Sequence, residues 1–155
     1  MTAPHDDPRR PVLTASLTSG VARVTRGLGE SVVLIDEILT LNHRIWETTL
    51  SVGDVEFYQD RDGPFPNHQM RVSVNPSLDG AALNYMQNDV SRMPIVNSYN
   101  PEPTIGVALI FSGTTGAVFP RSAVIPIVEA RRALNEWLRT RHRPTCIEWR
   151  PFESR

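Results

Sequence analysis

The clearest candidate for covalent chemistry is the single cysteine, Cys146, which follows His142 and precedes Glu148. A thiol attacks as its thiolate, so it needs a base or a nearby cation, and His142 could supply one. However, Cys146 lies in an alternating run that ends at Trp149, and a cysteine in such a strand is usually a small buried hydrophobic residue. We therefore expect no catalytic residue here.

Three further patterns are incomplete as ligand sites. His43 and Glu47 are four residues apart, but a zinc site requires a second histidine, so we expect a surface or capping role for His43. The run Asp60-Arg61-Asp62-Gly63 lacks the later ligands and the closing glutamate of a calcium loop, which predicts a polar turn. Gly113-Thr114-Thr115-Gly116 lacks the lysine of a phosphate loop and also predicts a turn. The sequence thus predicts no metal site, no cofactor and no enzyme.

Tyrosines lie among acidic residues in two regions that the sequence predicts to be loops. Tyr58 precedes Asp60 and Asp62, and Tyr99 stands in a segment rich in proline and asparagine that contains Glu102. Protein interfaces use aromatic side chains as buried anchors and carboxylates to steer a basic partner. Solvated loops with incidental tyrosines remain an open alternative. The predicted partner-binding residues are Asp54, Glu56, Tyr58, Asp60, Asp62, Tyr99 and Glu102.

Charge is distributed unevenly along the chain, although the net charge is only −1. Between Glu47 and Glu102 there are eight acidic residues and three arginines, whereas from Arg121 to Arg155 there are eight arginines and four glutamates. The middle is therefore acidic and the end basic. A general nucleic-acid binder would need a clear overall excess of positive charge, which argues against direct nucleic-acid binding.

Length and composition predict one soluble domain. A chain of 155 residues with 40% hydrophobic residues can bury a sizeable core. The longest apolar run, Ile105 to Phe111, is too short to cross a membrane. Residues 1–11 carry charges and prolines without an apolar signal-peptide core, so we expect a flexible tail and a domain over 12–155. One cysteine cannot form an internal disulfide, which favours a cytoplasmic protein.

Hydrophobic periodicity predicts two helices separated by strands. Ser31 to Leu41 reads as the first helix, and the second follows Pro126, which is tolerated in a first helical turn. The apolar face of the second helix is Ile127, Ala130, Leu134, Trp137 and Leu138. The predicted strands cover a hairpin or strand at 12–24, then 45–52, a strand or loop at 55–58, a hairpin of 70–74 and 82–86, and 95–98, 105–111, 117–119 and 145–149.

This order of elements predicts an α+β fold, in which one N-terminal and one C-terminal helix pack on an antiparallel β-sheet with meander connections. In the predicted strand 45–52, Trp46, Thr48 and Leu50 would share a side. Trp46 is expected in the core, as are most other aromatic residues in predicted elements.

Several segments resemble the Imm1 family of bacterial immunity proteins. The likeness covers Met70 to Trp149: a hairpin with a glycine before an apolar strand (Gly80 to Tyr85), Phe119-Pro120, Ile125-Pro126 at a helix start, and the closing run Arg143-Pro144-Thr145-Cys146-Ile147-Glu148-Trp149. Residues 12–66 match only in the order of their elements. The chain departs from the family pattern in the central strands after the hairpin, where such proteins often carry a tryptophan and this chain has Met93-Pro94-Ile95-Val96-Asn97-Ser98-Tyr99.

The resemblance implies a cytoplasmic protein that binds a cognate toxin domain and blocks its active site. Imm1-like proteins are associated with nucleic-acid deaminase toxins, among others. Such toxins must bind phosphates, so an acidic inhibitor surface would complement them. Two other classes stay open at this point: a regulatory or structural subunit of another complex, and a small enzyme, which the missing catalytic set disfavours.

Overall fold

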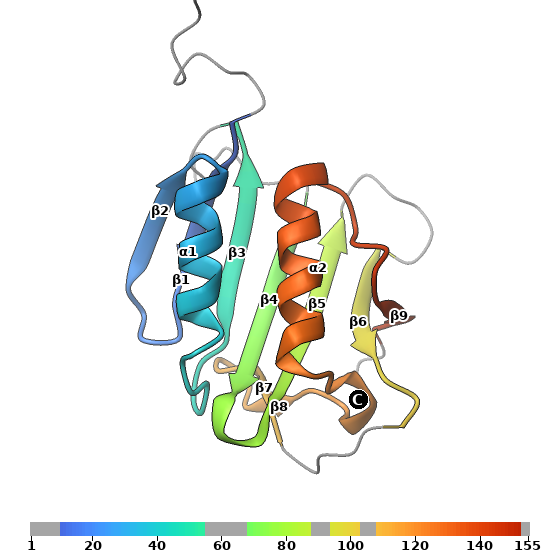
Figure 1. Ribbon diagram of the computed structural model, residues 1–155. Helices are drawn as coiled ribbons and strands as arrows, with labels where there is room; N and C mark the ends of the chain where they lie inside the picture. Colours follow the sequence, from blue (N-terminus) through green and yellow to red (C-terminus); the bar gives the residue numbers. More distant parts are fainter. Residues whose placement is uncertain (1–9, 55–67, 88–93, 103–107, 153–155) are drawn as a thin grey trace, which may run out of the picture.

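The computed structural model describes residues 10–54, 68–87, 94–102 and 108–152. Two helices lie side by side on one face of a seven-stranded antiparallel sheet (Figure 1). The strand order is β2-β1-β3-β4-β5-β6-β9. The predicted α+β class and its two helices are confirmed. The elements of this layer are β1 (Val12–Ser16), β2 (Ala22–Arg26), α1 (Leu28–Ile38), β3 (Thr48–Gly53), β4 (His68–Asn75), β5 (Gly80–Gln87), β6 (Ile95–Tyr99), α2 (Ile127–Thr140) and β9 (Glu148–Pro151).

The main core lies between the helices and the facing side of the sheet. Alternate residues of the central strands point toward the helices and are buried, as the period of two requires. On β4 and β5 these residues pair across the strands, with Met70 opposite Tyr85 and Val72 opposite Leu83. The core of the sheet therefore follows directly from the alternating pattern of the sequence.

Helix α2 buries most of the face that its periodicity predicts, although Ile127 is only partly buried and Ala133 is buried as well. Pro126 occupies the N-cap position and Arg141 ends the helix in the left-handed conformation, at φ 58°. Its buried residues are Ala130, Ala133, Leu134, Trp137 and Leu138. The indole N–H of Trp137 is satisfied within the core, because it donates to Nδ1 of His68 at 2.9 Å. An antiparallel bridge between Ala81 and Ile125 attaches the start of α2 to β5.

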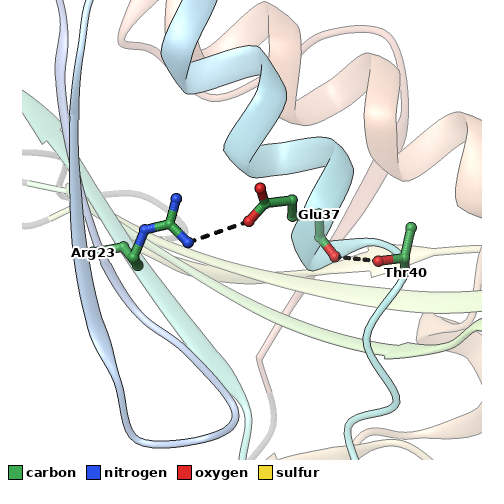
Figure 2. A network of polar contacts seen from close by, with 3 residues as sticks. All are labelled: Arg23, Glu37 and Thr40. Atoms are coloured by element: carbon green, nitrogen blue, oxygen red, sulfur yellow. Dashed lines mark hydrogen bonds and ion pairs between the residues drawn. The ribbon is translucent and has the colours of Figure 1, made fainter.

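Helix α1 begins and ends about one turn earlier than predicted, at Leu28 and Ile38. Figure 2 shows how its C-terminal turn is held: the Arg23 guanidinium of β2 pairs with the Glu37 carboxylate at 3.3 Å, and the Thr40 hydroxyl donates to the Glu37 carbonyl at 2.6 Å. An ion pair between Arg131 and Asp36 at 3.0 Å connects the two helices. The ends of α1 are therefore set by contacts outside its own periodicity.

Two strands begin later than predicted. The strand expected at 45–52 is β3, which starts at Thr48, and the strand expected at 145–149 is β9, which starts at Glu148. Thr145 stays outside the ladder because its backbone N–H and hydroxyl bind the Glu136 carboxylate of α2. The predicted hairpin at 12–24 is formed by β1 and β2. The segment 55–58 lies outside the described residues.

A small second sheet lies against the side of the main sheet that faces away from the helices. It consists of β7 (Ile110–Ser112) and β8 (Ala117–Val118), shorter than the predicted strands 105–111 and 117–119, of which residues 105–107 are not described. Arg71 of β4 fixes this hairpin, since it donates to the Phe111 carbonyl at 2.9 Å and lies 4.4 Å from the centre of the Phe111 ring. Phe111 also contacts Phe119 edge-on, at 5.2 Å between ring centres.

Candidate partner-binding surface

The structure separates the residues predicted to bind a partner. Asp54 directly follows β3, whereas Tyr99 is the last residue of β6. Since β3 and β6 run in opposite directions, these residues lie at opposite ends of the sheet (Figure 1). Glu102 follows Tyr99 and lies at the same end of the sheet as Tyr99. The remaining predicted residues, Glu56, Tyr58, Asp60 and Asp62, lie outside the described residues.

Asp54 is exposed but already has a partner within the chain. One of its carboxylate oxygens lies 2.6 Å from Nη1 of Arg141, the residue that ends α2, and 72% of the Asp54 side chain is accessible to solvent. An ion pair this exposed contributes at most about 1 kcal/mol. Asp54 could therefore exchange this contact for one with another protein at small cost.

Tyr99 is half-buried, and one face of its ring is covered. The Arg150 guanidinium of β9 lies 4.0 Å from the ring centre, which is a cation–π arrangement. The next residue, Asn100, holds the following turn, because its side-chain oxygen accepts the Glu102 backbone N–H at 3.1 Å. The Glu102 residue itself is exposed. This end of the sheet thus presents an ordered tyrosine and an available carboxylate.

The same end of the sheet carries an apolar feature that the sequence prediction missed. Ile45 and Trp46 precede β3 and are 71% and 45% exposed. The expectation that Trp46 lies in the core beside Thr48 and Leu50 is wrong, although Thr48 and Leu50 do share a buried side. The Trp46 carbonyl accepts the Thr18 hydroxyl at 2.6 Å, before the strand ladder begins. The adjacency of Ile45 and Trp46 was an available signal, because neighbours in a strand cannot both face one core.

His43 is a buried structural residue, so the predicted surface position is wrong. Only 3% of it is exposed, and both ring nitrogens have partners. Nδ1 donates to the Leu41 carbonyl at 2.9 Å, and Nε2 accepts the Thr48 hydroxyl at 2.7 Å. Burial lowers the pKa of His43 from its ordinary value of 6.5, against the smaller raising effect of the backbone contacts and of Glu47. A neutral imidazole therefore joins the end of α1 to the start of β3.

A polar cavity of about 350 Å³ opens beside His43. Its lining residues are Asn42, His43, Arg44, Asn75, Ala108 and Leu109. A general base must offer a free nitrogen to a reacting group, and the two nitrogens of His43 are both occupied. Among the residues that the structure describes, no three histidine, cysteine or acidic side chains gather as a metal ion would require.

Cys146 is partly buried against the main core, as expected for a small hydrophobic residue. Burial raises the pKa of its thiol, and the nearby Glu136 carboxylate raises it further. The thiol is therefore protonated at neutral pH, whereas an activated nucleophile requires a lowered pKa.

Comparison with protein families decides what kind of protein carries this surface. Residues 22–151 match the family described as immunity protein Imm1. The chain belongs to the Imm1 family. The match starts at the first residue of β2 and ends at the last residue of β9, so it includes both helices and the exposed pair Ile45 and Trp46. No curated protein sequence matches this Imm1 protein.

The Imm1 match extends well beyond the segment that carried the sequence resemblance. The likeness was clear from Met70 to Trp149, while the family match also covers residues 22–69. No helix among the described residues of this Imm1 protein is long and apolar enough to cross a membrane.

Proposed function

We propose that this Imm1 protein binds a cognate bacterial toxin domain in the cytoplasm and inhibits it by covering the toxin's active site. The observation that carries the proposal is the family match over residues 22–151. An inhibitor of this kind protects the producing cell from its own toxin. It acts through shape and charge complementarity and needs no reacting group of its own.

The toxin class that we propose is a nucleic-acid deaminase. Such an enzyme must bind the phosphate backbone of its substrate, so its cleft is basic. The region between Glu47 and Glu102 of this chain has eight acidic residues and three arginines, which would complement that cleft. The residues predicted from the sequence, Asp54, Glu56, Tyr58, Asp60, Asp62, Tyr99 and Glu102, are the proposed contacts.

The distance between the two ends of the sheet makes these contacts separately testable. A strand rises about 3.3 Å per residue, and β3 has six residues, so Asp54 and the Tyr99 end lie roughly a strand length apart. Asp54→Arg and Glu102→Arg should each slow association with a basic toxin domain only if the corresponding end contacts it. Association rates at low and high salt identify which end is used.

The decisive experiment combines this protein with the toxin domain encoded beside its gene. Cells that produce only the toxin domain should die, whereas cells that also produce this protein should survive. With purified proteins, conversion of cytosine or adenine in DNA and RNA should stop at a one-to-one ratio. Failure of the cells to survive would refute the immunity function. Complete inhibition at far lower ratios would refute inhibition by binding and indicate an enzyme that acts on the toxin.

A further inference from the structure

Ile45 and Trp46 are the only exposed large hydrophobic residues that are neighbours in the described part of the chain. Exposed single apolar residues are ordinary, but this isoleucine and tryptophan place two large exposed apolar side chains next to each other in the sequence, just before β3. Tryptophan is also among the residues that contribute most binding energy in protein interfaces. We propose that Ile45 and Trp46 are the central anchors of the surface that holds the toxin domain, an inference that rests on the proposed function.

The backbone that carries these two side chains is fixed before any partner binds. The His43 backbone N–H donates to the Val74 carbonyl of β4 at 2.9 Å. The His43 ring joins this segment to Thr48 of β3, and the Thr18 hydroxyl holds the Trp46 carbonyl. Contacts from two strands, β3 and β4, and from the loop after β1 thus leave this short segment little conformational freedom. A preorganised anchor loses little entropy on binding, which is what a tight inhibitor requires.

The tryptophan side chain is held as well as its backbone. Its ring lies against Gly113 in the turn between β7 and β8, so closely that a Cβ on Gly113 would be 2.1 Å from Cε3 of Trp46. The Gly113 backbone N–H donates to the Glu47 carboxylate at 2.8 Å, which fastens the same turn to the residue after Trp46. The hairpin thus supports one side of the ring while 45% of Trp46 remains exposed.

The neighbouring charges indicate the chemistry of the partner surface. Arg44 is exposed and forms no ion pair with any other described residue. The toxin domain should therefore offer an apolar depression for Ile45 and Trp46 with a carboxylate at its rim for Arg44. A second copy of this chain fits less well, because a two-fold contact centred on Trp46 would bring two Arg44 side chains together. The nearby Glu47 is already engaged by Gly113.

The position of this surface agrees with one part of the predicted set. The pair precedes the first residue of β3, and Tyr99 is the last residue of β6, so both lie at the same end of the sheet. Tyr99 and Glu102 can therefore contribute to the periphery of an interface centred on Trp46. Asp54 lies at the opposite end and would contribute to it least.

The test measures affinity for the purified toxin domain encoded beside the gene, by biolayer interferometry. Ile45→Asp and Trp46→Ala should each weaken binding by about 30-fold or more, as expected for hot-spot residues. Ile45→Asp is the cleaner variant, because the Ile45 side chain is mostly in solvent and its replacement should leave the melting temperature unchanged. Val33→Asp is the matched control, since Val33 is 58% exposed but lies on α1; it should change affinity by less than about threefold.

The outcomes separate this inference from the proposed function. If the wild-type protein neither binds nor inhibits the toxin domain, the proposed function fails, and the inference with it. If the wild type binds and folded Ile45→Asp binds equally well, only the inference fails. Sedimentation at rising concentration tests the remaining alternative, in which a second copy of this chain binds the surface. A dimer that Ile45→Asp abolishes, with toxin binding unchanged, would assign the surface to a second copy and overturn the inference.

Discussion

Gly113→Ala tests the contact that holds Trp46 in place. The backbone of Gly113 has no positive φ, so alanine is compatible with its conformation. The added Cβ would lie 2.1 Å from Cε3 and 2.4 Å from Cδ2 of Trp46, whereas carbon atoms in contact are about 3.5–4.0 Å apart. The ring must therefore move outward by more than about 1 Å, and overpacking of this kind costs about 1–3 kcal/mol.

The expected magnitude is at the lower end of that range. Trp46 is 45% exposed, so its ring can turn into solvent without disturbing the main core. Alanine also restricts the unfolded chain more than glycine does, which stabilises the folded protein by about 0.4–1 kcal/mol. We expect Gly113→Ala to lower the free energy of unfolding by about 1 kcal/mol in the wild type. In a Trp46→Ala background the same substitution should be neutral or slightly stabilising.

Urea denaturation followed by circular dichroism measures the stability of the wild type, Gly113→Ala, Trp46→Ala and the double variant. The expected coupling between the two sites is about 1–2 kcal/mol, within the range found for residues in contact. Gly116→Ala is the control in the same hairpin: its φ is +75° and no atom lies within 4 Å of an added Cβ, so it should cost about 1–2 kcal/mol in both backgrounds. An equal cost of Gly113→Ala with and without Trp46 would refute the packing described here.

Three further outcomes are expected from the buried and paired groups. Burial lowers the pKa of His43 below 6.5. As the pH falls, His43 is therefore protonated in the unfolded chain before it is protonated in the folded protein, and stability should fall below about pH 6.5. Melting temperatures of the wild type and His43→Gln across this pH range test this, and the same pH slope in both proteins would contradict it. Asp54→Asn removes only an exposed ion pair with Arg141 and should cost less than about 1 kcal/mol at low salt; a larger loss in urea denaturation would mean that Arg141 depends on it. Cys146→Ser should leave inhibition of the toxin domain intact, because burial and Glu136 raise the thiol pKa and so disfavour the thiolate that a reactive role needs; loss of inhibition by a folded variant would show the opposite.

The part of the fold that periodicity encodes could be predicted from the sequence. The buried stripe of α2 and the β4–β5 hairpin are both confirmed, since each follows from one regular pattern. The boundaries of α1 could not be predicted in the same way. Gly27 at φ 91° starts this helix before its apolar pattern becomes regular, and the contacts of Glu37 and Thr40 shape its end.

The errors around β3 have a common cause in long-range contacts. An alternating reading of residues 45–52 takes no account of Thr18, which captures the Trp46 carbonyl, or of Gly113, which receives the Trp46 ring. His43 is buried because Thr48 and Leu41 satisfy its ring, and neither contact has a spacing that marks it in advance. The local sequence pattern thus predicts the sheet, whereas tertiary contacts determine which side chains remain exposed at its end.

The charge distribution in three dimensions also differs from the distribution along the chain. The arginine-rich end of the sequence suggests a basic surface, but three of its arginines are neutralised within the described structure: Arg131 by Asp36, Arg132 by Glu129 and Arg141 by Asp54. The face formed by the helices is therefore a less basic target for a partner than the sequence implies.

The face of the sheet that the helices cover and the end of the sheet before β3 are consequently used in different ways. One side of the sheet and the helices together bury the main core, and ion pairs satisfy charges on the helices' outer surface. The end of the sheet before β3 has the opposite character, because hydrogen bonds fix its backbone while Ile45 and Trp46 remain in solvent. Stability requires neither side chain to be exposed there. A fixed, exposed apolar pair at that end is the feature on which the proposed recognition of a toxin domain rests.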